Sequence, residues 1–575
     1  MLLRLRSSAD LLAEADDRLH RPATTVVAAV PLLGRSLDAE RAVVDAARAA
    51  VGAAVVAAEA VPDLEPEDGG LPVERLARLG TDLDREVGAA ERALRRLERT
   101  STALTPGQVG EAVAEARADL EPAVSALRGA ASGSLAAADL LGADGPRSIL
   151  VVLQNNAELR GAGGYFGAFA LATGRDGKLA VGPFRDPTDV SHPPERAVQV
   201  EAPAEFREDY GPFLADTTLW QMFNMSPDVP DSAAVGAAVA GKLLGDRPDA
   251  VLLLDTVALG RLVELGDAPV RLPSGDEVDG DDLLEALLVD TYSDAGDDYR
   301  AQAARQRELR AAAGTTAAEL LTSSDVEADD AARAVRRLVA GRHLAVWAAD
   351  PETQEHLVEA GAAGRLAAGS GDLVHVSVNN LTANKLDYYV DRQVEHSVTL
   401  RDDRAEVVQR VVLTNRAPAD LVPYVAGQRQ PGTSDLRVEL STSPRAQVVS
   451  LTVDGADARG DVRRGEDRTR VLTYVTLSRG EQVEVELRYA LDLEDDAYRA
   501  TLVPQPLARP AELTIEITGQ ELAVPDGFSR DGAVLRRAEE WEGQELLEVA
   551  PAPRSTWEQV RRALRDFWSE PVALP

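Results

Sequence analysis

Hydrophobic and polar positions change their spacing twice along this chain, and the changes predict three kinds of structure. Up to about residue 143, alanines, valines and leucines recur at helical spacing. From residue 146, short apolar runs bounded by turn residues take over, which is typical of buried strands. After about residue 391, apolar and polar residues alternate, as in strands with one buried face. The pattern therefore predicts a multidomain α+β protein.

The changes in spacing divide the chain into three expected domains. Residues 1–143 should form a helical hairpin or short bundle, residues 144–390 a layered α/β domain, and residues 391–575 an immunoglobulin-like β-sandwich with a short C-terminal helix. In the α/β domain we expect the strands that end at Gln154, Phe184 and Asp255 to share one sheet with helices on both sides. A buried strand over residues 372–378 should close that domain.

The most distinctive chemistry follows the first buried strand, residues 149–153. Polar residues and glycines come next in the chain, and a later strand ends in an arginine and an aspartate; these residues are Gln154, Asn155, Asn156, Glu158, Arg160, Gly161, Gly163, Gly164, Arg185 and Asp186. Adjacent strands would bring Arg160 and Arg185 to neighbouring edges of one sheet. Guanidinium groups match phosphate oxygens in pairs, so this edge predicts an anion-binding cradle.

The same residues also have a purely structural interpretation, which the sequence leaves open. Asn and Gly tolerate positive φ, so Asn155, Asn156 and the glycines can form a tight turn. Arg185 and Asp186 can be a surface ion pair of little energetic consequence. The arginines of a predicted helix can be its solvated face; they are Arg300, Arg305, Arg307 and Arg310. A polar group farther along is expected to cap a strand and close a turn; it comprises Asn379, Asn380, Asn384, Lys385 and Asp387.

Composition excludes several classes of function. A net charge of −35 argues against a general nucleic-acid or anionic-lipid surface. The absence of cysteine rules out disulfides, thiol catalysis and thiolate zinc sites. The six histidines form no HExxH pattern, and neither a P-loop nor a G-x-S-x-G elbow occurs. The acids Asp281, Asp282 and Glu285 lack the alternation of a calcium-binding loop and suit a helix N-terminus.

Four blocks of the chain resemble a family of bacterial cell-envelope proteins of unknown function, of the DUF4012 type. The blocks read QNNAELRGAGGYFGAF, NMSPDVPDSA, DAVLLLDTVALGRLV and NNLTANKLDYYVDR. Members of that family usually carry an N-terminal transmembrane helix. No segment here approaches ~18 uncharged apolar residues. The resemblance therefore implies an anchor missing from this sequence and a location at the extracytoplasmic face of the membrane.

The order of elements from residue 149 to residue 309 is also similar to the LytR–CpsA–Psr family. That family transfers glycans from polyprenyl pyrophosphate to cell-wall acceptors. The resemblance equates the block GPFRDPT, with Arg185 and Asp186, to the family's Arg-Asp turn. It equates Arg305 and Gln306 to an Arg-Gln pair on a following helix. The family's metal-binding acids fall here on Asn155 or Asn156 and on the glycines, and Mg²⁺ favours anionic oxygens, so magnesium has little support and no other cofactor is expected.

These observations assign roles to individual residues. Glu158 and Asp186 are the candidates for catalysis, since either carboxylate could activate an acceptor hydroxyl. The candidates for substrate binding are Asn155, Asn156, Arg160, Gly163, Gly164, Arg185, Arg305 and Gln306. The expected partner is a polyprenyl-linked glycan or cell-wall polymer, and no nucleic acid is expected. The alternative is a non-catalytic envelope scaffold that binds a glycan or other proteins.

Overall fold

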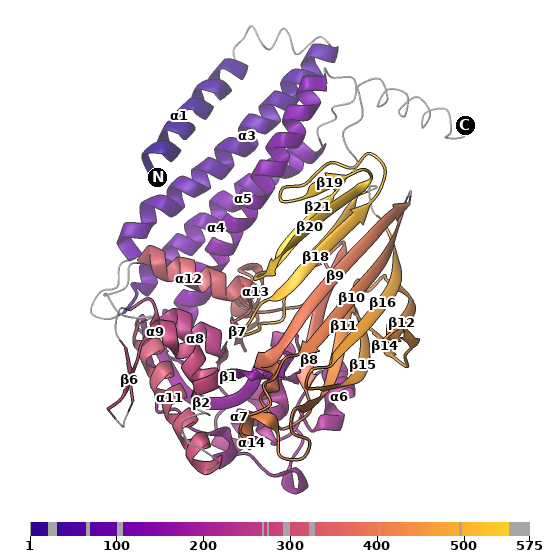
Figure 1. Cartoon of the computed structure of the whole chain (residues 1–575). Coiled ribbons are helices and arrows are strands. Elements are labelled where there is room, and N and C mark those ends of the chain that lie inside the picture. Colours follow the sequence, from indigo (N-terminus) through magenta and orange to yellow (C-terminus); the bar gives the residue numbers. More distant parts are fainter. Residues whose placement is uncertain are drawn as a thin grey trace. The chain divides into compact units, whose positions relative to one another are not determined.

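The computed structural model describes residues 2–20, 31–64, 70–99, 107–266, 269–272, 275–290, 299–320, 328–401, 403–493 and 497–550. The chain separates into two compact units, one built from helices within residues 1–139 and one that continues from residue 140 (Figure 1). None of the described helices is long and apolar enough to cross a membrane.

The first unit is a helical bundle, as the helical spacing predicts. It contains α1 (Leu2–Leu19), α3 (Pro31–Ala60), the short η1 (Val61–Leu64), α4 (Val73–Arg99) and α5 (Gly107–Leu140). Its core is made largely of small side chains, among them Ala46, Ala53, Ala90 and Ala93, which are buried with Leu97. Small residues at helical spacing let the helix backbones approach closely, so this composition favours a bundle of long helices.

The second unit begins with a five-stranded sheet in the order β3-β2-β1-β4-β7. The strands are β1 (Arg147–Arg160), β2 (Gly163–Arg175), β3 (Lys178–Val181), β4 (Ala250–Leu254) and β7 (Leu344–Ala348). β1 runs antiparallel to β2 and parallel to β4. The prediction that the strands around residues 149–153 and 250–254 share a sheet is therefore confirmed.

Apolar side chains cover both faces of this sheet. Leu150 and Val152 of β1 pack in a cluster with Trp220 on one face, while Val151 and Leu153 pack with Leu309 on the other. The neighbouring helices are α6 (Ala204–Tyr210), α7 (Val229–Leu244), α8 (Thr256–Val263), α9 (Gly280–Glu285), α11 (Tyr299–Leu320), α12 (Ala328–Ala340) and α13 (Pro351–Glu359). Shorter helical turns include η2 (Pro187–Asp189), η5 (Trp220–Met225) and η6 (Ala286–Asp290). Alternate residues of β1 thus face two cores, which explains the continuous apolar run.

The second unit also contains a two-stranded sheet, β5 (Val270–Arg271) and β6 (Glu277–Val278), and a β-sandwich whose two sheets share one apolar core. The six-stranded sheet has the order β14-β15-β11-β8-β17-β21, and the eight-stranded sheet the order β13-β12-β16-β10-β9-β18-β20-β19. The first sheet contains β8 (Asp372–Asn380), β11 (Thr433–Thr442), β14 (Asp461–Arg464), β15 (Thr469–Ser478), β17 (Tyr498–Leu502) and β21 (Glu545–Val549). The second contains β9 (Val390–Arg401), β10 (Arg404–Asn415), β12 (Gln447–Val453), β13 (Ala456–Asp457), β16 (Gln482–Asp492), β18 (Ala511–Thr518), β19 (Ser529–Asp531) and β20 (Val534–Trp541).

One strand differs from the expected division of the chain. β8, predicted to close the α/β domain before a boundary at residue 390, pairs with β11 and β17 inside the sandwich. Its residues are buried throughout because one face meets the sandwich core and the other faces the α/β region. The sequence DLVHVSVNN predicts a strand and carries no signal of which sheet that strand joins. The predicted C-terminal helix lies outside the described residues.

Candidate functional site

The candidate site begins where β1 and β2 meet in a hairpin. The pairing of the two strands is interrupted between Leu153 and Gln154, and again between Asn155 and Leu159. Residues 156–158 therefore leave the regular ladder. Two glycines allow the close approach of backbone at this end, since a Cβ on Gly164 would lie 2.1 Å from the carbonyl oxygen of Asn155, and one on Gly161 would lie 2.2 Å from that of Met225.

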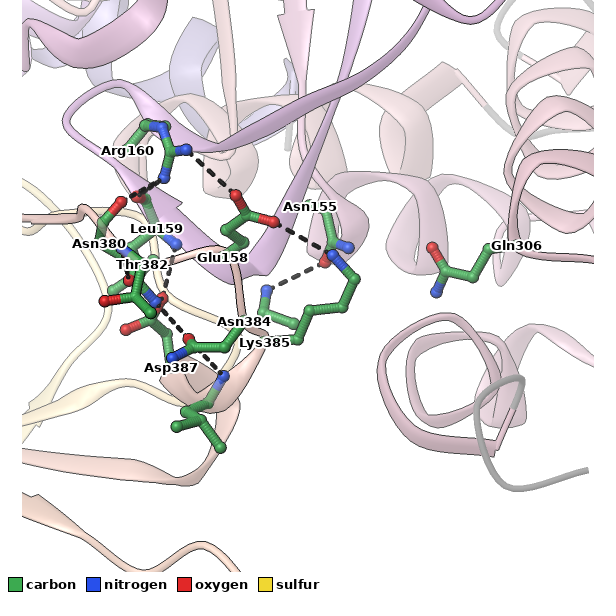
Figure 2. Close-up of polar contacts among 12 residues, drawn as sticks. Asn155, Glu158, Leu159, Arg160, Gln306, Asn380, Thr382, Asn384, Lys385 and Asp387 are labelled. Atoms are coloured by element: carbon green, nitrogen blue, oxygen red, sulfur yellow. Dashed lines mark hydrogen bonds and ion pairs between the residues drawn. The ribbon is translucent and has the colours of Figure 1, made fainter. Parts of the chain in front are cut away.

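Three charged side chains meet at the end of β1 (Figure 2). Oε1 of Glu158 lies 3.1 Å from Nη2 of Arg160, and Oε2 lies 3.1 Å from Nζ of Lys385. Arg160 also donates to the carbonyl oxygens of Leu159 and Asn380, each at 2.8 Å. All three charged side chains are at most 10% exposed. Glu158 and Arg160, both predicted site residues, are thus brought together, and both are engaged by the protein itself.

The loop after β8 holds Lys385 in this position. Asn380 donates from Nδ2 to Asn384 at 2.9 Å and to Asp387 at 2.8 Å, and Asp387 also accepts from the backbone N–H of Leu159 at 2.8 Å. Burial raises the pKa of Asp387 to about 6, against the opposing effect of these two hydrogen bonds. A cavity of about 10 Å³ lies beside Asp387, with room for one water molecule. The polar block after β8 therefore ties the sandwich to β1.

The side-chain amides predicted to bind substrate, Asn155 and Asn156, form hydrogen bonds within the protein. Nδ2 of Asn156 donates to Asp255 at 2.8 Å, and its Oδ1 accepts from the backbone N–H of Thr256 at 3.1 Å. Oδ1 of Asn155 accepts from the backbone N–H of Ala157 at 3.0 Å. Both are buried, and Asn156 fastens the end of β1 to the first turn of α8. Among the described residues, no three His, Asp or Glu side chains are placed to hold a metal ion.

Helix α11 brings a second group of polar residues to β2. Nη1 of Arg307 lies 3.2 Å from Oδ2 of Asp186, just beyond the edge of the sheet. Arg310 is buried, donates to the side chain of Gln306, and has no hydrogen-bond partner at Nε among the described residues. A Cβ on Gly167 would lie 2.3 Å from Nη1 of Arg310, so a larger residue here would require this guanidinium to move. We call Asp186, Gln306, Arg307 and Arg310 the α11 cluster.

Tyr165 connects the two groups electrostatically. Burial raises the pKa of the Tyr165 phenol above its ordinary value, and the charges of Glu158 and Asp186 raise it further. Arg160 and Lys385 oppose this effect. The guanidinium of Arg160 also lies over the Tyr165 ring, 5.3 Å from its centre. Charges at the end of β1 and in the α11 cluster therefore both act on the pKa of Tyr165.

The three arginines named as substrate-binding candidates contact three different sets of partners. Arg160 is bound to Glu158, Arg185 lies over the ring of Phe169 with 5.4 Å to its centre, and Arg305 lies 3.9 Å from Asp276. Figure 2 shows Gln306 on α11, without a contact to the residues at the end of β1. The contact that joins the Arg-Asp turn to α11 is made by Arg307, two residues beyond Arg305.

Sequence reasoning missed Lys385, Arg307 and Arg310 as site residues. The pattern around Lys385 predicts a turn, although Lys385 is one of only three lysines and lies in a block of polar residues. A solvated helix face is one interpretation of Arg310, yet it follows Gln302 and Gln306 at intervals of four, and all three are buried. That spacing puts the three polar side chains on one face of a helix and could have indicated a buried polar stripe.

Comparisons with known proteins identify part of the chain. Residues 144–292 match the model of a family described as a protein of unknown function, DUF4012, which supports the resemblance for the three signature blocks within these residues. No curated protein matches the sequence.

Similarity to solved structures is weak. A Legionella pneumophila protein described as nutrient-binding aligns at 7% identity and a TM-score of 0.24, over 32% of this chain and 72% of that one. A zinc metallopeptidase from Deinococcus radiodurans aligns at 13% identity and a TM-score of 0.18, over 28% of this chain and 42% of that one. This chain therefore spans less than half of the peptidase, and at these TM-scores neither alignment carries an argument about function.

Proposed function

We propose that the second unit binds the pyrophosphate group of a polyprenyl-linked glycan at the extracytoplasmic face of a bacterial membrane, during assembly of cell-wall or surface polysaccharide. The proposal starts from the similarity of residues 149–309 to the LytR–CpsA–Psr family. It is supported by the meeting of the Arg-Asp turn with the helix that carries Gln306. It places the anion at the α11 cluster.

The observation that carries the proposal is the position of Arg310, beside Gly167 and three residues after Arg307, which contacts Asp186. Its guanidinium is buried beside a glycine that leaves it room, and its Nε lacks a partner among the described residues. A buried donor without a partner costs ~1–3 kcal/mol, and more when it is charged. A phosphate oxygen would satisfy such a donor. Arg307, half exposed three residues earlier, could exchange Asp186 for a second phosphate oxygen.

The same contacts favour binding over turnover by the carboxylates named from the sequence. Both oxygens of Glu158 are held by cations, and Asp186 accepts from Thr188 as well as from Arg307. Neither would be available as a base without a rearrangement. An envelope scaffold that recognises a lipid-linked glycan therefore remains the second candidate function.

Isothermal titration with farnesyl pyrophosphate tests the proposal. Replacing Arg307→Ala or Arg310→Gln should weaken binding by ~1.5–3 kcal/mol each, the scale of a charge-assisted hydrogen bond. Gly167→Ala should weaken it through displacement of Arg310. The matched control is Arg305→Ala on the same helix, whose guanidinium faces Asp276 and should not matter.

Farnesol separates the anion from the apolar tail, since it keeps the isoprene units and lacks the pyrophosphate. We expect farnesol to bind at least tenfold more weakly than farnesyl pyrophosphate. Equal affinity for the two, or equal loss in the Arg305→Ala control and in Arg307→Ala, would reject a pyrophosphate site at the α11 cluster.

A further inference from the structure

His343 differs in its surroundings from the histidines of the sandwich core. It precedes β7, is 16% exposed at its side chain, and its Nδ1 lies 2.6 Å from Oδ2 of Asp255. His375 and His396, by contrast, are fully buried in the sandwich, and burial lowers the pKa of each. A partly exposed imidazole held by a buried carboxylate is the arrangement that prepares a histidine for proton transfer.

Asp255 is itself rigidly held. The carboxylate is 1% exposed, and its Oδ1 accepts from the backbone N–H of Ala258 at 2.9 Å in the first turn of α8. Its Oδ2 accepts from Asn156 at 2.8 Å as well as from His343. Held by Ala258 and Asn156, the carboxylate can fix the ring of His343 with the proton on Nδ1. Nε2 is then left as the basic atom.

The other nitrogen of the ring is reachable. Nε2 of His343 has no hydrogen-bond partner among the described residues, although the ring is not fully buried. Gly341 lies over it, and a Cβ there would be 3.2 Å from Nε2 and 2.8 Å from Cδ2. A side chain at position 341 would meet the ring and also the backbone carbonyl oxygen of Glu542, 2.9 Å from its Cβ, so glycine leaves the approach to Nε2 open.

The pair lies beyond the carboxyl end of a strand of the α/β sheet. Asp255 follows the last residue of β4, whose Leu254 pairs in parallel with Leu153 in the middle of β1. In open α/β sheets, ligands bind at this edge. Asn156 links Asp255 directly to the segment that carries Glu158.

We infer that Asp255 and His343 form a proton-transfer dyad, in which Nε2 of His343 accepts the proton of an acceptor hydroxyl group. The inference rests on the proposed function for its substrate, a hydroxyl-bearing glycan or polymer. The hydroxyl oxygen attacks the phosphorus attached to the glycan, and its proton passes to Nε2. An O–P bond forms, the bond from that phosphorus to the bridging oxygen breaks, and its electron pair leaves with the polyprenyl phosphate. Asp255 is the positioning residue of the pair.

The variant His343→Asn separates this role from a structural one. The Asn side chain can keep the donor to Asp255 that Nδ1 supplies, and it lacks an equivalent of Nε2. We expect it to keep the melting temperature and farnesyl pyrophosphate affinity of the parent, and to reduce glycan transfer to an acceptor at least 100-fold. Asp255→Asn should redistribute the imidazole proton between the two ring nitrogens, which ¹⁵N long-range NMR reads without any substrate. Gly341→Leu should block modification of His343 by diethyl pyrocarbonate.

These experiments distinguish failure of the dyad from failure of the proposed function. Glycan transfer by His343→Asn at the rate of the parent would overturn the dyad. So would a parent protein that binds farnesyl pyrophosphate and transfers no glycan. Neither result would contradict the proposed binding of pyrophosphate. An imidazole that carries its proton on Nε2 in the parent, or that resists diethyl pyrocarbonate, would overturn it as well. Loss of farnesyl pyrophosphate binding in the α11 variants has no bearing on the tautomer and tests the proposed function alone.

Discussion

Nζ of Lys385 lies 3.1 Å from Oε2 of Glu158, although 227 residues separate them in the chain. The contact joins the loop after β8 to the end of β1 and is shielded from solvent. Arg160 binds the other carboxylate oxygen, so one buried anion holds two buried cations. The ends of the α/β sheet and of the sandwich are therefore fixed to one another by a charge cluster.

Breaking this cluster should be costly. Glu158→Gln leaves two buried cations without their anion, and we expect it to lower the free energy of unfolding by ~3–5 kcal/mol. Lys385→Met alone should cost less, since Arg160 still pairs with Glu158. Urea unfolding followed by far-ultraviolet circular dichroism measures both. If Lys385→Met proved the more damaging change, the central role given to the carboxylate would be wrong.

The raised pKa of Asp387 predicts a dependence of stability on pH. Its value of about 6 lies above the ~3.9 of an exposed Asp, so between these values the folded state holds a proton that the unfolded chain has lost. The free energy of unfolding should therefore fall as pH rises from about 4 to about 6, and then level off. Asp387→Asn should reduce this slope and stabilise the protein at pH 7 by ~1–3 kcal/mol.

Unfolding curves at a series of pH values test this prediction against an exposed control. Asp420→Asn changes the same charge at the surface and should leave the slope of the parent intact. An Asp387→Asn protein that keeps the full slope would show that other groups cause it.

The hairpin glycines should be irreplaceable for reasons of space. A Cβ on Gly164 would overlap the backbone of Asn155, so Gly164→Ala should destabilise the second unit by at least ~3 kcal/mol or prevent its folding. Gly211→Ala is the control, because Gly211 has helical angles and its Cβ would lie 3.5 Å from the nearest atom. Thermal unfolding should find this control neutral or slightly stabilised. Equal effects of the two changes would contradict the steric argument.

Asp372 should be the most sensitive polar residue of the sandwich core. Its Oδ2 accepts from the hydroxyls of Tyr489 and Tyr498 at 2.6 and 3.0 Å, and its Oδ1 accepts from Thr442 and two backbone N–H groups. In Asp372→Asn, the amide N–H group would face hydroxyl or backbone N–H groups that donated to the carboxylate, and the change should cost ~3 kcal/mol or more. Tyr498→Phe removes one of these bonds together with the contact of its hydroxyl with Nε2 of His396, and should cost ~1–2 kcal/mol. Denaturant titration would refute this ranking if it gave the reverse order.

Periodicity alone determined the broad architecture. The helical spacing before residue 143, the apolar runs of β1 and β4, and the later alternation correctly predicted a bundle, a two-sided sheet and a β-rich region. These features follow from which positions are apolar, and that is written locally in the chain. The sequence did not predict the short strand β7, LAVWA, because five mostly apolar residues fit a buried helix or strand equally well.

Only the tertiary structure decided which distant residues meet. Sequence placed Asn156, Glu158 and Arg160 at one strand end, yet it could not show that Asp255, Lys385 and Asn380 would occupy their polar groups. It named Arg305, whereas the rotation of α11 about its axis brings Arg307 to Asp186 and buries Arg310 under Gly167. Register, helix rotation and the sheet that β8 joins depend on packing between segments far apart in the chain. The local pattern sets what each segment can form, and packing selects its partners.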